Sequence, residues 1–323
     1  MTDSGLDLVT GGCGFIGRHL VAALHARGRQ VRVLDTAGLP SGMSGVVHHQ
    51  ASILSHEAVD EAVEGVEHVY HVAGDPSLWS KGQHDFDRTN RTGAEMVLDA
   101  AVAAGARRII LTSTHAIDVK SKGPVKEATM PGPYTRAKFR AEQYALKLIG
   151  EGAPIIAVAP TMPMGPGDVN LTPPMRMLLE FLRGENPAYY EFETNLIDVR
   201  EVAEGHVLAA ERGEVGVRYV LGRHNVLMSE FLSLVERLSQ KPMPRRRIPF
   251  AVALASAWAF EGAALVTRKP PRASVEGVRL AKQLKPVPGN PAAALDLPEW
   301  PLEDMLRDAI AWFEHEGYWT RDG

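Results

Sequence analysis

Short strand-like runs alternate with longer helix-like segments along the first half of the chain. The short runs are rich in β-branched residues or alternate polar with apolar positions, which favours strands. The longer segments place apolar residues at helical spacing and end at or next to a glycine, which favours helices. The expected strands are Leu6–Thr10, Gln30–Leu34, Val66–Val72, Arg108–Leu111 and Ile155–Val158, and the expected helices are Phe15–Arg27, Thr92–Ala104 and Tyr134–Ile149. This alternation predicts βαβ units, and therefore an α/β fold built on a parallel sheet.

The pattern changes after about residue 160. The segments 161–174 and 285–301 are rich in proline and glycine or lack periodicity, so we expect loops there. Further helices are expected at Met175–Arg183, Val202–Arg212, Ser229–Ser239 and Leu302–Glu316. We expect a nucleotide-binding domain and a smaller, mostly helical substrate-binding region. Residues 1–160 and a returning segment at about 195–225 are assigned to the nucleotide-binding domain. Residues 161–194 and 226–323 are assigned to the substrate-binding region.

Composition excludes several classes of protein. The 323 residues include 35 Lys and Arg against 39 Asp and Glu, and a net charge of -4 argues against a nucleic-acid partner. Cys13 is the only cysteine, which excludes an intramolecular disulfide and a cysteine-based zinc site. The histidines lack metal-binding spacing, so we predict no metal. The N-terminal sequence lacks the pattern of a signal peptide, and we expect a cytoplasmic protein.

The most apolar segment is 250–266, FAVALASAWAFEGAALV. It has 17 residues and is interrupted by Glu261, whereas a bilayer span needs about 20 apolar residues. We therefore expect a buried or amphipathic helix and no integral membrane span, and contact with a membrane surface stays open. The basic run Arg245–Arg247 has two interpretations, a solvated loop or a site for phosphate or lipid headgroups.

Residues 10–17, TGGCGFIG, space three glycines as GxxGxxG between an expected strand and an expected helix. Glycines at Gly11, Gly14 and Gly17 allow a tight turn and let backbone N–H groups approach a pyrophosphate at the helix N-terminus. Asp35 follows 18 residues after Gly17, at the end of the next expected strand, where a carboxylate can accept from both ribose hydroxyls. A tight turn beside a solvated aspartate is the alternative, and the agreement of spacing, context and acid disfavours it.

Asp35 also bears on the choice of cofactor. A carboxylate repels a 2′-phosphate, and residues 36–38 supply no cation, so we predict NAD. Arg18 and Arg32 are near enough in sequence to keep NADP open.

Tyr134 and Lys138, in the run YTRAK, lie four residues apart and share one face of a helix. A lysine cation beside a tyrosine is expected to lower the pKa of the phenol toward neutrality, which suits an acid/base group. Hydroxyl side chains at 112–114 follow an expected strand, at the edge where parallel sheets bind ligands. An ordinary amphipathic helix could carry YxxxK by chance, but glycine turn, acid, hydroxyls and YxxxK occur together and in order.

Together with HVAG at 71–74 and Asn90 in NRTGAEMVLDAA, this series of motifs resembles the extended short-chain dehydrogenase/reductases. The resemblance covers nearly the whole chain and implies a Rossmann fold with a doubly wound parallel sheet. It is greatest to the branch of dihydroflavonol reductases, 3β-hydroxysteroid dehydrogenases and hopanoid-associated sugar epimerases. The segments DPSLW and NPAYYEFETNLIDV carry the similarity to the last of these. Members are often dimers, which implies a homodimer through the helices near 90–104 and 134–149.

The resemblance implies a role for individual residues. The catalytic set is Thr114, Tyr134 and Lys138. The cofactor set is Gly11, Gly14, Phe15, Ile16, Gly17, Asp35, Ser52, Ile53, Ala73, Gly74, Asn90, Tyr134, Lys138 and Pro160. Ser52 and Ile53 stand where the family often has Asp-Leu, which puts that adenine contact in doubt, and Ala159 replaces an arginine often found before Pro160.

We expect hydride transfer between NAD and a ketone or secondary alcohol. The apolar segment 250–266 and methionines after Pro160 favour a bulky apolar substrate, with contacts at Trp79, Met162 and Met164. One alternative is a nucleotide-sugar epimerase or dehydratase that uses bound NAD. A second is a non-catalytic cofactor-binding subunit.

Overall fold

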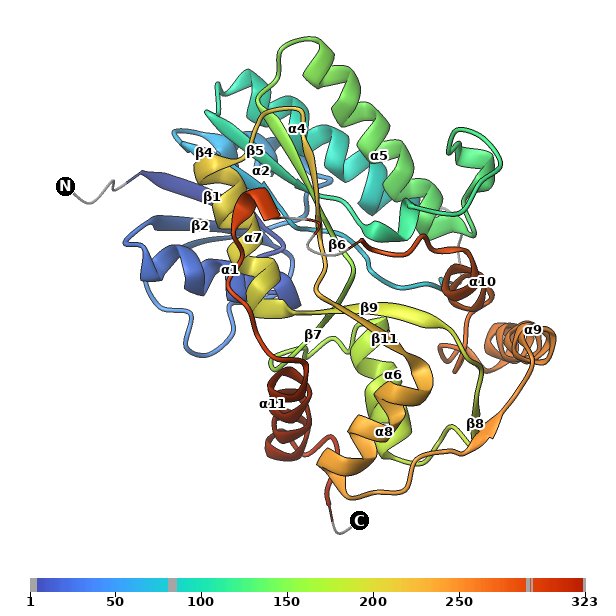
Figure 1. The fold of residues 1–323 in the computed structure, drawn as a ribbon. Helices are drawn as coiled ribbons and strands as arrows, with labels where there is room; N and C mark the ends of the chain where they lie inside the picture. The colour runs from blue at the N-terminus through green and yellow to red at the C-terminus, as the bar shows by residue number, and fades with distance from the viewer. Residues whose placement is uncertain (1–4, 81–85, 289–290, 292, 322–323) are drawn as a thin grey trace.

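The computed structural model of the protein describes residues 5–80, 86–288, 291 and 293–321 (Figure 1). Its larger region is built on a seven-stranded parallel sheet in the order β10-β6-β5-β4-β1-β2-β3. The strands are β1 (Leu6–Thr10), β2 (Gln30–Asp35), β3 (Val46–Gln50), β4 (His68–His71), β5 (Arg108–Thr112), β6 (Ile155–Pro160) and β10 (Arg218–Leu221). The strand order reverses at β1 and β4, and this arrangement creates a binding crevice at the carboxyl ends of the strands.

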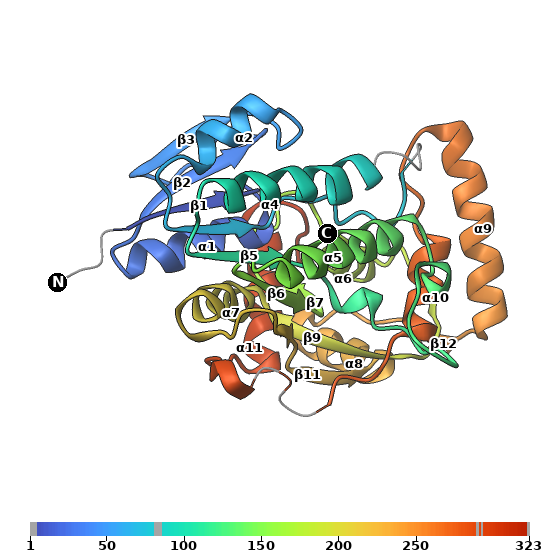
Figure 2. The same ribbon diagram turned by 90° about the horizontal axis from the view of Figure 1, so that it is seen from above.

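Helices cover both faces of this sheet (Figure 2). One face packs against α2 (His56–Val63), α4 (Gly93–Ala103) and α5 (Pro133–Gly150), and the other against α1 (Phe15–Ala26) and α7 (Val199–Arg212). Burial on both faces explains why the interior strand β6 is buried along its whole length and reads as a continuous apolar run. The predicted doubly wound Rossmann fold is confirmed.

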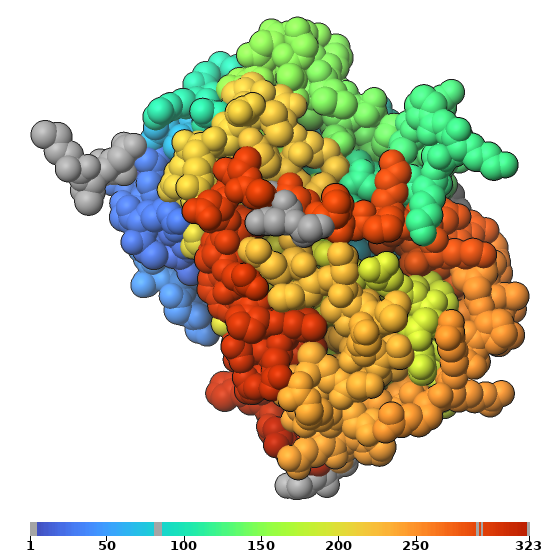
Figure 3. Space-filling model, viewed as in Figure 1, coloured from blue at the N-terminus to red at the C-terminus, as the bar shows by residue number. Residues whose placement is uncertain are grey.

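The smaller region carries the three-stranded sheet β11-β9-β7, the two-stranded sheet β12-β8 and several helices (Figure 1). Its strands are β7 (Met162–Met164), β8 (Ala188–Tyr189), β9 (Glu193–Asp198), β11 (His224–Leu227) and β12 (Arg246–Arg247). Its helices are α6 (Pro173–Leu182), α8 (Met228–Ser239), α9 (Phe250–Thr267), α10 (Val275–Gln283) and α11 (Leu302–His315). Figure 3 shows its later segments, in orange and red, spread over much of one face of the molecule. Short helical turns lie at η1 (Asp87–Thr92), η2 (His115–Ile117), η3 (Glu127–Thr129) and η4 (Ala293–Leu295).

The structure contains strands that the sequence pattern did not predict, namely β3, β7, β8, β9, β10, β11 and β12. Most are short, and β7 lies inside the proline-rich segment expected to be a loop. After α7, the chain returns to the large sheet through β10, which pairs in parallel with β6. The segment 193–198 instead joins the small sheet as β9. The division of the chain into the two predicted domains stays a prediction.

The segment 250–266 forms a helix, but the expectation that this helix is buried or amphipathic is wrong. Only Ala253, Ala257 and Ala264 of α9 are buried, because α10 covers just one side of it. Among the described residues, α9 is the one helix long and apolar enough to cross a membrane, a criterion of length and composition alone.

Candidate active site

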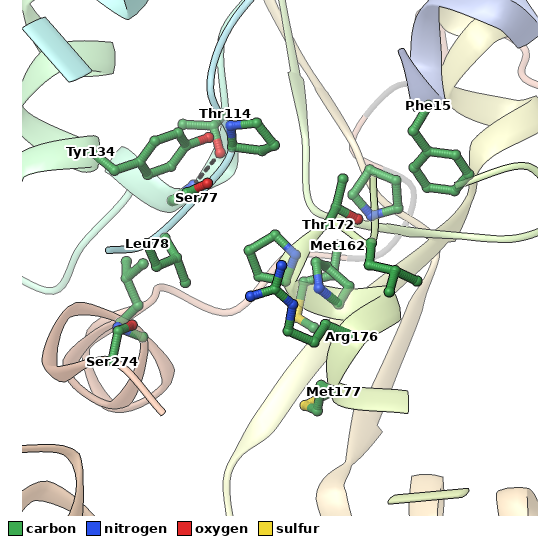
Figure 4. A pocket seen from close by; sticks show the side chains of 18 of the residues that line it. Phe15, Ser77, Leu78, Thr114, Tyr134, Met162, Thr172, Arg176, Met177 and Ser274 are labelled. Atoms are coloured by element: carbon green, nitrogen blue, oxygen red, sulfur yellow. Dashed lines mark hydrogen bonds between the residues drawn. The ribbon is translucent and has the colours of Figure 1, made fainter. Parts of the chain in front are cut away.

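A cleft of about 2400 Å³ runs between the two regions, from the glycine turn to α9. It gathers residues that lie far apart in the sequence. All of the residues predicted to bind the cofactor line it, as do Thr114, Trp79 and Met162. Figure 4 shows Tyr134, Thr114 and Ser77 together on one side of the open space, with Arg176 and Met162 across from them.

The glycine turn is packed so closely that side chains are excluded. A Cβ on Gly17 would lie 2.1 Å from the carbonyl oxygen of Gly11, and one on Gly11, whose φ is +70°, would lie 2.7 Å from Ala73. Helix α1 starts at Gly14 with no side-chain cap, so its first N–H groups face the cleft without an acceptor from the N-cap residue. The buried Nε of Arg18 also has no hydrogen-bond partner among the residues that the structure describes. These unpaired donors fit the pyrophosphate of a dinucleotide.

Asp35 holds this turn in place from the end of β2. Its carboxylate accepts from the backbone N–H groups of Cys13 and Ala37, both at 2.9 Å, and lies on the cleft. Arg32 is directed elsewhere, because its guanidinium donates to carbonyls at the end of α2, whereas Arg18 lines the cleft. The geometry keeps Asp35 in position for an adenosine ribose, with Arg18 as the nearby cation.

Asp35→Ala should weaken NAD binding by roughly tenfold, because charge-assisted hydrogen bonds to the ribose are lost. NADP binding should weaken less, since repulsion of the 2′-phosphate is relieved. Titrating both cofactors against both proteins measures the change in their ratio, which separates this effect from a disturbed glycine turn that would weaken both. A wild-type preference for NADP would contradict the role given to Asp35.

The remaining cofactor residues surround the turn. Ser52 accepts from the N–H of Leu54 at 3.1 Å, and the buried Ile53 packs against Gly93, where a Cβ would lie 2.5 Å away. Asn90 clamps the loop after β4, because its amide accepts from Asp75 N–H at 2.8 Å and donates to Asp75 O at 2.9 Å. A Cβ on Gly74 would lie 2.8 Å from Asn90 Oδ1, so the loop passes this amide closely.

Thr114 and Tyr134 lie next to each other on the wall of the cleft (Figure 4). The Thr114 hydroxyl accepts from Ala116 N–H at 3.1 Å, which leaves its proton for the Tyr134 oxygen. Burial raises the pKa of Tyr134 to about 12, so the phenol keeps its proton near neutral pH. This corrects the expectation that Lys138 lowers that pKa.

Lys138 is directed at the end of β5, where its Nζ donates to Thr112 O at 2.8 Å. Burial lowers the pKa of Lys138 to about 8. The strand end is fixed in turn by His206, whose Nδ1 contacts Val202 O at 2.7 Å. A nitrogen facing a carbonyl must donate, so Nε2 accepts from the Thr112 hydroxyl at 2.8 Å. Burial lowers the pKa of His206 to about 4, which keeps this imidazole neutral.

A charged cluster holds the backbone of Thr114, and the sequence analysis did not predict this cluster. Arg218 donates to the carbonyl of Thr114 at 2.9 Å and pairs with Asp118 and Glu142, both at 3.0 Å. Glu142 also accepts from the Ser113 hydroxyl, which commits that hydroxyl to the cluster. The one feature of the sequence that could have indicated this cluster is the position of Glu142, one helical turn after Lys138.

Glu276 of α10 caps the helix that carries Tyr134. The N-cap residue of α5 is Gly132, which has no side chain, and Glu276 accepts from the N–H groups of Tyr134 at 3.2 Å and Thr135 at 2.8 Å. It also accepts from the Thr135 hydroxyl at 2.7 Å. Burial raises the pKa of this carboxyl, while the donors oppose that rise. No sequence signal links residues so far apart.

Of the residues predicted to contact the substrate, two line the cleft and one does not. Trp79 and Met162 line the cleft, and so does Met177. Met164 is fully buried with Met175 in the core of the smaller region and does not reach the cleft, so its predicted substrate contact is wrong. Among the described residues, no group of three His, Cys, Asp or Glu side chains could hold a metal.

A doubly wound sheet with a glycine turn at its switch point, and a Thr–Tyr pair beside it, defines a dinucleotide-dependent oxidoreductase fold and site. The chain belongs to the NAD dependent epimerase/dehydratase family, whose model matches residues 8–222. This confirms the expected resemblance and NAD as the cofactor.

Relatives agree with this class. The chain is 34% identical over 325 residues to "Putative dihydroflavonol 4-reductase" of Synechocystis sp., covering 96% of this chain and 95% of that protein. It is 27% identical over 332 residues to "Sterol demethylase protein B" of Methylococcus capsulatus, covering 96% and 98%. The crystal structure of gox2253 matches with a TM-score of 0.85 and 31% identity, covering 98% and 100%. The expected enzyme class, an NAD(P)-dependent dehydrogenase or reductase of the extended short-chain type, is confirmed.

Proposed function

We propose that the protein transfers hydride between NAD and a ketone or secondary alcohol on a bulky apolar molecule, such as a lipid, keto-sphingolipid, terpenoid or steroid-like compound. The apolar lining of the cleft beyond Tyr134 carries this proposal, because apolar walls favour apolar ligands. Side chains from several elements supply that lining. They include Leu78, Trp79, Met162, Met177, Phe192 and Phe250.

The residues of this chain account for the chemistry around the transferred hydride, which NAD supplies or accepts when bound. In reduction, Tyr134 donates its proton to the carbonyl oxygen, and Thr114 donates a hydrogen bond at the same place. These two groups stabilise the negative charge that develops on that oxygen. Lys138, whose Nζ is held at the end of β5, would bind the nicotinamide ribose of the bound cofactor.

One observation favours a nucleotide-sugar epimerase or dehydratase as the second candidate. Arg176 of α6 lines the cleft beside Met162 and Met177, across from Tyr134 (Figure 4). A guanidinium in this position suits a diphosphate. The Thr114–Tyr134 pair argues against a non-catalytic subunit, because a binding role would not require it.

Binding titrations on the NAD-loaded enzyme separate the two candidates. A long-chain ketone should bind saturably in the micromolar range, and Arg176→Met should leave that binding unchanged or tighten it, since the variant only extends the apolar wall. A UDP-sugar should not bind. Saturable binding of the UDP-sugar that Arg176→Met abolishes, with none of the ketone, would overturn the proposed substrate and favour the epimerase.

We also propose a cytoplasmic location and a homodimer formed through α4 and α5. Exposed apolar side chains on these helices, Val102 and Leu146, support the second part. No nucleic-acid partner is proposed, since the net charge is -4.

A further inference from the structure

Helix α9 stands at the outer edge of the smaller region, with α10 on one side (Figures 1 and 2). Its covered side carries the buried Ala253, Ala257 and Ala264 and the half-buried Phe250, Leu254 and Glu261. The Glu261 carboxylate accepts from Val275 N–H at 2.7 Å and so ties α9 to α10. The rest of the helix surface is open to solvent among the described residues.

The exposed face of α9 from Ala251 to Val266 is apolar. The exposed positions between Phe250 and Val266 carry only alanine, glycine, valine, leucine, phenylalanine and tryptophan. Three of these side chains are large and protrude far, with Trp258 55%, Leu265 59% and Val266 84% exposed. A helix on the surface of a globular protein normally turns a charged or polar face to water, so this face calls for an apolar partner.

Positive charge borders this apolar face at both ends. Arg245, Arg246 and Arg247 precede α9, and Arg268, Lys269 and Arg272 follow it, whereas Glu261 is the only acid from 244 to 273. Two of the six cations contact carboxylates, Arg245 with Glu236 at 2.6 Å and Arg247 with Glu191 at 4.0 Å. No ion pair joins the other four to any described residue.

We propose that α9 docks the enzyme on an anionic lipid surface and lies in the plane of the interface. Its apolar face enters the boundary between headgroups and acyl chains, and the flanking arginines and lysine bind lipid phosphates. An orientation across the bilayer is disfavoured because Glu261 and the contact with α10 hold one side of the helix on the protein. The proposal goes beyond the proposed function, since docking requires no particular substrate.

A second copy of the chain fits this face less well than a lipid surface does. In a two-fold contact through α9, an antiparallel pair would place the basic segment before one helix against the basic segment after the other. Like charges at both ends of such a contact are unfavourable, whereas anionic headgroups neutralise all of them.

Docking at α9 would also place the substrate end of the cleft against the lipid. Val252, Ser256 and Phe260 of α9 line the cleft, as do Arg246 and Arg272 beside it. An apolar ketone could then pass from the acyl chains into the cleft without crossing water. This consequence for substrate entry rests on the proposed function, unlike the docking itself.

Vesicle co-sedimentation without substrate tests the docking directly. The enzyme loaded with NAD should bind vesicles that contain equal parts of phosphatidylcholine and phosphatidylglycerol, and salt should weaken that binding. The double variant Leu265→Glu, Val266→Glu should lower the partition coefficient at least about tenfold, since two apolar side chains no longer enter the lipid. The double variant Arg268→Gln, Lys269→Gln should lower the partition coefficient about tenfold on these mixed vesicles and leave it unchanged on vesicles of phosphatidylcholine alone.

The matched control places the same charges on exposed valines elsewhere. Val47→Glu, Val215→Glu should bind vesicles as wild type does, and all variants should keep the wild-type thermal transition and NAD affinity. Absence of vesicle binding by the wild type would overturn the proposal. So would a wild-type dimer that ignores vesicles and that Leu265→Glu, Val266→Glu converts to monomers, because α9 would then be a subunit contact.

Discussion

Tyr134→Phe should lower kcat by about a hundredfold or more, the usual consequence of losing a general acid. The variant removes the hydroxyl that donates to the substrate oxygen but keeps the ring that packs against Phe86. The glycine turn and Asp35 are untouched, so the Kd for NAD should stay within about twofold. Steady-state turnover and NAD titration, measured on the same preparation, check both parts.

Tyr144→Phe provides the matched control for this substitution. Tyr144 lies on the same helix, but its hydroxyl donates to Asp99 at the outer surface, away from the cleft. Its loss should leave kcat unchanged. Near-normal turnover by Tyr134→Phe would sink the acid/base assignment whatever the substrate turns out to be.

Glu276→Ala should lower kcat from about tenfold to a hundredfold, although Glu276 reaches the substrate only through α5. The substitution leaves the N–H groups of Tyr134 and Thr135 without their acceptor, so the first turn of α5 loosens and Tyr134 shifts relative to Thr114. The free energy of unfolding should fall by about 2 kcal/mol, because buried donors lose a charged acceptor while the cost of burying that carboxylate is recovered. KM should change little, since Glu276 makes no substrate contact. Chemical denaturation and turnover measure the two effects.

Two further variants separate a positioning role for Glu276 from general destabilisation. Glu276→Gln keeps one oxygen for Thr135 but faces Tyr134 N–H with a donor, so it should restore most of the stability and part of kcat. Ser55→Ala removes the cap of α2, where Ser55 accepts from Ala58 N–H, and should lower stability by about 1 kcal/mol with kcat unchanged. Wild-type kcat in a folded Glu276→Ala protein would show that Glu276 does not position Tyr134.

The parts of the site that the sequence predicted are those whose geometry is local. The glycine turn and Asp35 belong to one βαβ unit, in which strand, turn and helix fix their relative positions. Tyr134 and Lys138 lie one helical turn apart, so both come from α5 wherever that helix packs. For the same reason, helical and strand periodicity sufficed for the doubly wound sheet.

Contacts between distant segments could not be predicted in this way. Glu276 and Tyr134 are 142 residues apart, and Arg218 and Thr114 are 104 apart, so no spacing rule connects them. The small strands β7, β9 and β11 pair with one another across distant parts of the sequence, and such short strands leave only a weak local pattern.

By itself, the sequence determined the fold class and predicted a cofactor site and a Tyr–Lys pair, because these depend on patterns within single structural units. Tertiary structure alone decided the direction of the Tyr134 pKa shift, since burial raises the pKa of the phenol and Lys138 is directed toward β5. It also decided that Met164 packs in the core while Met162 reaches the cleft, and that α9 is exposed. Burial is set by which elements cover a residue, and that depends on the packing of the whole chain.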